Sequence, residues 1–181
     1  MNVSEITDLV LPEAPGIFVR TVDDMVMRAT REFCEETYSL VERVTVYFPA
    51  GKDAGEVEAD SFDMEPLSVL SVVDSPSSYC QVSFGEIRLQ RPVKEAKRLV
   101  MDVAVRPKLG GKDIPDSLRP YLDAIRCGAL AHCLVMPYEW ADQNRAMYYK
   151  QQFQSYIHDA KQRNANGYHA GNRQSRGKQW L

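Results

Sequence analysis

The spacing of apolar residues changes period twice along this 181-residue chain, and no other feature limits its fold as strongly. Near the start, apolar residues recur every three or four positions, which is the period of a helix with one buried face. These residues are Phe18, Val22, Met25, Ala29 and Phe33. The pattern predicts a helix over 16–38, after a turn-rich lead-in around Pro12 and Pro15.

A period of two replaces the helical period between residues 42 and 110. Val44, Val46 and Phe48 alternate with more polar neighbours, and similar runs follow at 67–73 and 99–105. A hairpin is expected about Gly85-Glu86. Because this region offers no helix for a parallel crossover, it predicts short antiparallel strands in a sheet or small sandwich.

Helical spacing returns after Pro115 and predicts two further helices. Asp116 or Ser117 is expected to cap the first of them, and Pro137 ends it. Its stripe is Leu118, Leu122, Ile125, Ala129, His132 and Met136. Asp142 is expected to cap the second, whose stripe is Ala146, Tyr149, Phe153, Tyr156 and Ala160. The short connection between them favours antiparallel neighbours.

These patterns together predict an α+β fold: a bundle of three main helices with an inserted antiparallel β lobe and an extended C-terminal arm. The segments are residues 1–41, the lobe 42–110, the helices of 111–162, and the arm 163–181. Each amphipathic stripe needs a partner, so the three helices should share one core. Its predicted members are Phe18, Val22, Phe33, Leu122, Ile125, Ala129, Tyr149 and Phe153.

Charge divides the chain unevenly. Residues 1–159 hold 25 acidic and 17 basic residues, a net charge of −8. The last 22 residues hold five basic residues and no acidic one, which brings the total to −3. The tail has few apolar residues with which to offset the entropy of ordering, so by itself it is expected to be extended.

Three interpretations of the tail stay open on the residues alone. A basic, glycine-containing arm could neutralise nucleic-acid phosphates, with Trp180 stacking on a base. It could equally dock on an acidic groove of a protein partner. The third interpretation is an unpacked, solubilising end, which many proteins have.

Candidate catalytic and metal-binding residues do not combine into a site. Cys127, His132 and Cys133 match neither a CxxC nor an HxxxH spacing, so no metal is predicted. Glu35 and Glu36 disfavour a thiolate at Cys34. The sequence therefore predicts no enzyme, no cofactor and reduced cysteines. It contains no signal-peptide core and no run long enough to span a membrane, which indicates intracellular synthesis.

Three runs and the tail give the chain a resemblance to a known family. The runs are 31–37 (REFCEET), 125–131 (IRCGALA) and 136–142 (MPYEWAD), the last followed by a helix with Tyr148, Tyr149 and Phe153. With the tail from Gly171 to Leu181, this order resembles the head–tail connector (adaptor) proteins of bacteriophages. The likeness covers about 15–181 and is greatest to adaptors of short-tailed phages, of the tail tubular protein A kind.

The resemblance implies a structural role in the virion, at the head–tail junction, after synthesis in the host cytoplasm. Such proteins form a homo-oligomeric ring, usually of twelve copies, between the portal protein and the tail or nozzle protein. Genomic DNA passes through the ring without specific binding, and no membrane takes part. The arm would dock on the portal through Arg163, Tyr168, Arg173, Arg176, Lys178, Trp180 and Leu181. Some members degrade cell walls, which no residue here supports.

Overall fold

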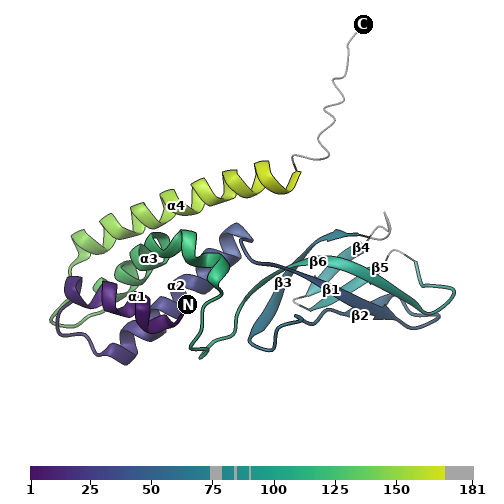
Figure 1. Cartoon of the computed structure of the whole chain (residues 1–181), viewed down its shortest axis with the longest axis horizontal. Coiled ribbons are helices and arrows are strands. Elements are labelled where there is room, and N and C mark those ends of the chain that lie inside the picture. Colours follow the sequence, from purple (N-terminus) through teal and green to yellow (C-terminus); the bar gives the residue numbers. More distant parts are fainter. Residues whose placement is uncertain (74–78, 84, 90, 170–181) are drawn as a thin grey trace, which may run out of the picture.

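The computed structural model describes residues 1–73, 79–83, 85–89 and 91–169. Helices and strands occupy two halves that lie side by side (Figure 1). We call residues 1–37 and 108–169 the helical half, and 38–107 the strand half. The mixed α+β class predicted from the sequence is confirmed.

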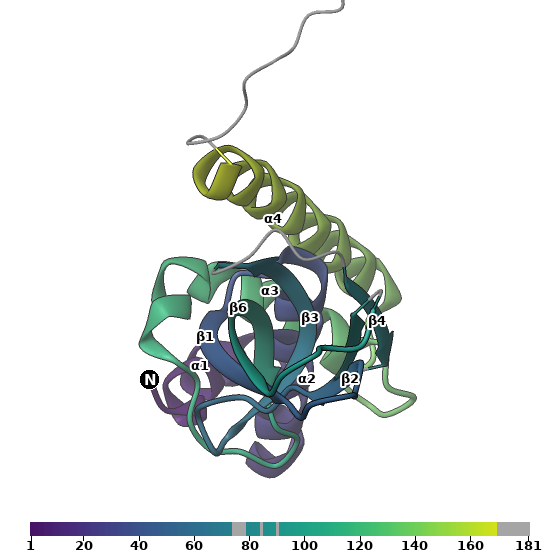
Figure 2. The ribbon, with the colours of Figure 1, turned by 90° about the vertical axis from the view of Figure 1, so that its right-hand side faces the viewer.

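The helical half holds four α-helices in its described part, one more than predicted. They are α1 (Val3–Val10), α2 (Val19–Thr37), α3 (Leu122–Leu134) and α4 (Gln143–His169), with short 3₁₀ turns at Leu11–Glu13 and Asp116–Tyr121. Helix α3 packs against the other three. Viewed along the molecule from the strand half, α1 and α4 lie on different sides of α3 (Figure 2).

Helix α1 precedes the predicted turn-rich lead-in and was not predicted. Its first turn carries a capping box: the Asn2 side chain accepts a hydrogen bond from the Ser4 amide at 2.9 Å, and the Glu5 carboxylate accepts one from the Asn2 amide at 3.0 Å. Val3, Ile6 and Val10 are buried on its inner side. The buried Thr7 adds a hydrogen bond to Asp23 of α2, whereas Glu5 and the other outward residues face solvent.

The prediction that Phe18 belongs to the core is wrong. Phe18 is the N-cap of α2, its backbone is extended (φ −67°, ψ 134°), and its side chain is 75% exposed. The buried stripe of α2 begins one turn later, at Val22. The four-residue spacing from Phe18 to Val22 therefore does not place Phe18 on the buried face. Helix α2 ends at Tyr38, whose left-handed φ of 51° turns the chain toward the strands.

The remaining predicted core residues lie inside or at the edge of the helical core. Phe33 is fully buried between Tyr121 and Phe153, with ring centroids 4.9 and 6.4 Å away. Val22, Ile125, Ala129 and Phe153 are buried, and Leu122 and Tyr149 are partly buried against them. Aromatic contacts therefore join α2 to α4 and to the 3₁₀ turn that precedes α3.

Two three-stranded antiparallel sheets form the strand half. Strand β6 (Lys97–Pro107) lies between β1 (Val41–Phe48) and β3 (Met64–Val72), with Val44 opposite Met101. The second sheet places β5 (Glu86–Leu89) between β2 (Ala54–Glu56) and β4 (Tyr79–Ser83). A Cβ on Gly55 would lie 2.8 Å from the Phe48 ring, so glycine allows β2 to approach β1 closely. The predicted antiparallel pairing is confirmed.

Four charged side chains link the two halves. Arg31 of α2 donates to the Pro107 carbonyl at 2.5 Å and to the Glu65 carboxylate of β3 at 2.6 Å. Arg106 of β6 pairs with both Glu65 and Glu35. Because two guanidinium groups share Glu65, the pKa of this carboxyl is lowered although burial opposes the shift. The network attaches the end of α2 to the central sheet.

The two C-terminal helices differ from the prediction at their ends. Pro120 lies in the 3₁₀ turn, so α3 begins only at Leu122, and it ends at Leu134, before Met136. Asp142 caps α4 as predicted, its carboxylate accepting from the Arg145 amide at 3.0 Å. Helix α4 then continues to His169, so the extended arm predicted to begin at 163 is wrong for 163–169. Nothing in that stretch interrupts the hydrogen-bond ladder.

Candidate assembly surfaces

Helix α4 has one buried stripe and a broad exposed face. Ala146, Phe153, Ile157 and Ala160 are buried against α2 and α3, and Tyr149 is partly buried. These positions follow the three-and-four spacing of a single seam. Every other side chain from Met147 to Arg163 is exposed.

The exposed side chains of α4 have an unusual composition. Between residues 147 and 158 the only Lys, Arg, Asp or Glu is Lys150. We define the α4 outer face as the uncharged exposed residues Met147, Tyr148, Gln151, Gln152, Gln154, Ser155 and Tyr156. Tyrosine and methionine are enriched in protein interfaces and charged residues are depleted at their centres. This face therefore has the chemistry of a protein-binding surface.

A groove runs between α2 and α4, with α3 as its floor. It has a volume of about 630 Å³. Arg28 and Glu32 line it from α2, and Met147 and Lys150 from α4. His132 lines it from α3, and Val135 from the position directly after α3. Val135 and Met147 are each 63% exposed, so the groove presents apolar surface between charged rims. We call it the α2–α4 groove.

Gly128 allows the helices beneath the groove to approach one another. A Cβ at this position would lie 2.9 Å from the Ala29 Cβ and 3.0 Å from the Phe153 ring. Glu32 and His132 cross the groove floor at 3.0 Å. The pKa of Glu32 is lowered, chiefly by this hydrogen bond, with Arg28 and Lys150 adding smaller attractions.

Glu13 fastens the N-terminal part of α4 to the body. Its carboxylate accepts hydrogen bonds from Tyr149, from Arg126 of α3 and, at 3.2 Å, from Arg145. The Tyr149 hydrogen bond is the largest cause of the lowered pKa of Glu13, followed among the favourable contributions by the two guanidinium groups. Burial and the same hydrogen bond raise the pKa of Tyr149. The 3₁₀ turn that contains Glu13 thus links α3 to α4 through side-chain hydrogen bonds.

A second attachment holds α4 near the start of the predicted arm. Lys161 pairs with Glu36 at 2.5 Å, and the Asn164 amide donates to the Thr37 carbonyl at 2.8 Å. One of the five basic tail residues is therefore already paired with the acidic body. The C-terminal end of α4 lies well away from the N-terminus (Figure 1).

The predicted docking residues are only partly described by the structure. Arg163 is exposed on α4, and Tyr168 belongs to the last turn of the same helix. The others lie outside the described residues: Arg173, Arg176, Lys178, Trp180 and Leu181. The sequence pattern did not indicate the α2–α4 groove, because its lining comes from three segments far apart in the chain.

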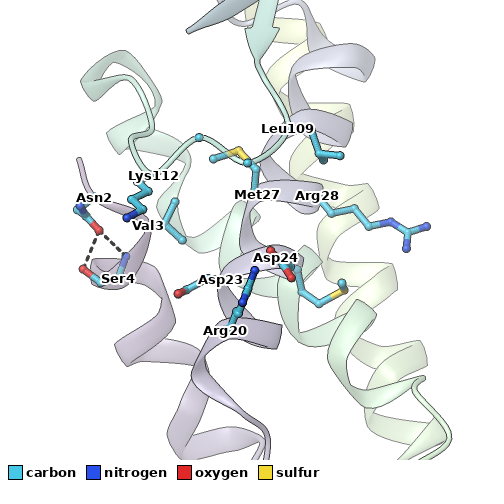
Figure 3. Close-up of a pocket in the computed structure, with 13 residues that line it drawn as sticks. Asn2, Val3, Ser4, Arg20, Asp23, Asp24, Met27, Arg28, Leu109 and Lys112 are labelled. Carbon is cyan, nitrogen blue, oxygen red and sulfur yellow. Dashed lines mark hydrogen bonds between the residues drawn. The ribbon is translucent and has the colours of Figure 1, made fainter.

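A pocket of about 950 Å³ lies between α1, α2 and the loop around Gly110 (Figure 3). Arg20, Asp23 and Asp24 gather on one side of it, and Arg28 extends away from them (Figure 3). Asp23 accepts a hydrogen bond from Thr7 at 2.5 Å, so this carboxylate has a structural partner. No histidine or cysteine is among the lining residues, and the arrangement supplies no nucleophile with a base.

Three cysteines in the described part are buried and unreactive. Burial raises the pKa of Cys34 to about 12 and that of Cys133 to about 11. Burial also raises the pKa of Cys127. Because the thiolate is the nucleophile and the metal-binding form, these thiols are poorly suited to either role. Within the described ranges, no group of three or more His, Cys, Asp or Glu side chains could hold a metal ion.

Comparison with known proteins adds no relative. The chain matches no protein-family model and no curated protein. Among the residues that the structure describes, none of the helices is long and apolar enough to cross a membrane.

Proposed function

We propose that this chain is a structural, non-enzymatic head–tail adaptor of a phage virion. Copies of it form a ring under the portal, join the DNA-filled head to the tail or nozzle, and dock on the portal through the C-terminal arm. In this proposal α2, α3 and α4 are the ring-forming bundle. The strand half is a lobe inserted into that bundle and directed toward the tail protein.

The observation that carries the proposal is the α4 outer face. Charged residues make up 26% of the chain, yet Lys150 is the only Lys, Arg, Asp or Glu from Met147 to Tyr156, and Tyr148 and Tyr156 are exposed there. Fixed to the body through Glu13 and Lys161, the helix presents this surface without having to fold on binding. A rigid aromatic surface loses little entropy when it is buried in a permanent assembly.

The three runs that carry the family resemblance fall at structurally meaningful places. Residues 31–37 close α2, residues 125–131 form the centre of α3, and residues 136–142 connect α3 to α4. The first two contribute buried residues to the shared helical core, and the third ends at the Asp142 cap. The resemblance therefore follows the framework of the helical half.

Acidic residues of the strand half fit passage of DNA through a ring. Glu56, Glu58, Asp60 and Asp63 are all exposed, and residues 56–63 contain no basic residue. Like charge disfavours adhesion of the phosphate backbone. A channel lined in this way would let the duplex slide without specific binding.

Truncation tests the docking role of the arm. Because Asn164 is bonded to the body and α4 continues to His169, the cut belongs after residue 169. Removing 170–181 should leave the thermal unfolding temperature unchanged and abolish attachment to portal-bearing heads in a sedimentation assay. Lys161→Ala in the full-length chain is the matched control and should still attach. Normal attachment of the truncated protein would refute docking by the arm.

The alternative function is a nucleic-acid-binding module that grips DNA with the same arm. Its signature is a gel shift by the isolated protein that weakens steeply with salt, with Arg173 and Arg176 setting the slope. Lys161 precedes the arm and is paired with Glu36, so the four basic residues of the arm itself would supply such binding: Arg163, Arg173, Arg176 and Lys178. A salt-dependent shift together with normal head attachment of the truncated chain would favour this alternative.

A further inference from the structure

The exposed side of α1 is acidic, whereas the rims of the α2–α4 groove carry the cations Arg28 and Lys150 on either side of Glu32. Ser4, Glu5, Asp8 and Leu9 point away from the core, and we call these four residues the α1 outer face. Leu9 is 43% exposed and lies next to Asp8, one turn after Glu5. In the part of the chain that the structure describes, Asp8 makes no ion pair, whereas Glu5 lies 3.7 Å from Arg119.

The groove offers complementary features. Val135 and Met147 give it an exposed apolar centre, and Arg28 and Lys150 stand at its rims. Neither of these cations forms an ion pair within the described residues, although both attract Glu32. An aliphatic side chain flanked by carboxylates matches this arrangement in size and charge.

The two surfaces lie on different sides of the molecule. Helix α3 lies between α1 and α4 (Figure 2). No residue of α1 lines the groove, so the α1 outer face and the groove are separate surfaces. A surface on one side that fits a different surface on another side produces head-to-tail association, which closes into a ring when the rotation permits. Pairing groove with groove would instead bring Arg28 and Lys150 of two copies together, and this like charge opposes a two-fold dimer.

We infer that the α2–α4 groove binds a second copy of this chain, which inserts Leu9 between Val135 and Met147. Asp8 and Glu5 of one copy then face Arg28 and Lys150 of the other. This inference rests on the proposed ring and identifies the surfaces through which neighbouring copies contact each other. Met147 belongs to both surfaces, and the rest of the α4 outer face, from Tyr148 to Tyr156, remains available to other components.

Disulfide trapping tests the contact. Leu9→Cys and Met147→Cys are made in separate chains that carry Cys80→Ser, since the other three native cysteines are buried. Under mild oxidation at high protein concentration, the mixture should give a disulfide-linked dimer, whereas each protein alone should remain a monomer. Leu109→Cys, which introduces a thiol at a 77% exposed position, is the matched control and should not link to Met147→Cys.

Two outcomes would overturn the inference. One is the absence of a mixed dimer, and the other is a dimer formed equally well by Leu9→Cys alone or by the Leu109→Cys control. Charge exchange gives a second measurement. Asp8→Lys is added to the Leu9→Cys chain, and Lys150→Asp to the Met147→Cys chain. Either change alone should lower the yield of mixed dimer several-fold, and the two together should restore it. Failure of the combination to recover would contradict the pairing of these two residues.

The result is separable from the adaptor role. Rings on portal-bearing heads without the Leu9–Met147 link would reject this interface and keep the proposed function. A specific mixed dimer from a protein that never attaches to heads would support this interface and reject the adaptor function.

Discussion

Helices α3 and α4 are neighbours in sequence and pack against each other, yet they bury very different fractions of their surface. Ala124, Ile125, Ala129 and Leu130 of α3 are at most 1% exposed, and the helix is enclosed by α1, α2 and α4. Helix α4 buries a single seam around Phe153 and leaves the rest in solvent. The first is the centre of a core, and the second is a covering helix with a free face.

This difference separates folding from assembly within one half of the molecule. Substitutions in or against α3 should lower the free energy of unfolding. Substitutions on the α4 outer face should change association while the fold remains stable. Each prediction below either sharpens this division or breaks it.

The largest effect is expected from Phe33→Ala. Phe33 of α2 is fully buried, and its ring lies between Tyr121 of the 3₁₀ turn and Phe153 of α4. The change therefore leaves a cavity between these two aromatic rings. The free energy of unfolding should fall by about 3–5 kcal/mol in urea denaturation. Tyr148→Ala is the matched control, an aromatic truncation on the outer face, which should change stability by less than about 0.5 kcal/mol. If both variants lost the same free energy of unfolding, the division between a folding core and an assembly face would be wrong.

Gly128→Ala tests the close approach of the helices at the groove floor. The new methyl group would lie 2.9 Å from the Ala29 Cβ, and Phe153 would have to move as well. Overpacking should lower the free energy of unfolding by about 2 kcal/mol, even though alanine favours helix more than glycine. Ala131→Gly, a helix change without that clash, is the control. A stabilised Gly128→Ala protein would show that α3 and α4 can separate freely.

Glu13→Gln should have a smaller effect, about 1 kcal/mol, because the carboxylate is partly exposed and solvent weakens its ion pairs. The folded-state pKa of Glu13 lies below the ordinary value of 4.5. Its contribution is therefore complete above pH 4.5 and is lost as the pH falls through the lowered value. The difference in unfolding free energy between wild type and Glu13→Gln should shrink with acidification. A difference that grows at low pH would contradict the assigned hydrogen bonds.

Lys161→Ala should have the smallest effect on stability. Both partners of the Lys161–Glu36 pair are about half exposed, and such surface pairs contribute between 0 and about 1 kcal/mol. Thermal unfolding at low and high salt measures it, and the small loss should disappear at high salt. A loss as large as that of Phe33→Ala would mean that the end of α4 belongs to the core.

Sequence patterns predicted the long elements of the fold better than its short ones. Asp142 was recognised as a cap because its side chain acts on the adjacent turn alone. Helix α1 was missed since eight residues show too little periodicity, although the Asn2–Glu5 capping box signals it. Phe18 has the right spacing for a buried residue, but no local pattern reveals that the helix starts one residue later. The end of α4 was also missed: the helix was predicted to end at residue 162, but no proline follows before His169 to stop it.

The assembly surfaces were beyond the reach of local patterns for a different reason. The groove combines Arg28, His132 and Met147, which come together only after three helices have packed. Sequence analysis could identify the unusual charge of the tail because that charge is a property of one continuous segment. It could not show that Lys161 is paired with Glu36, 125 residues away.

Electron microscopy of portal-bearing heads incubated with the purified protein tests the central claim most directly. The account predicts a closed ring of this protein beneath the portal, with helical halves in contact around the ring and strand halves pointing away from the head. The same heads with the protein lacking 170–181 should show bare portals. Density for isolated copies, or protein scattered over the capsid with none at the portal, would contradict the account.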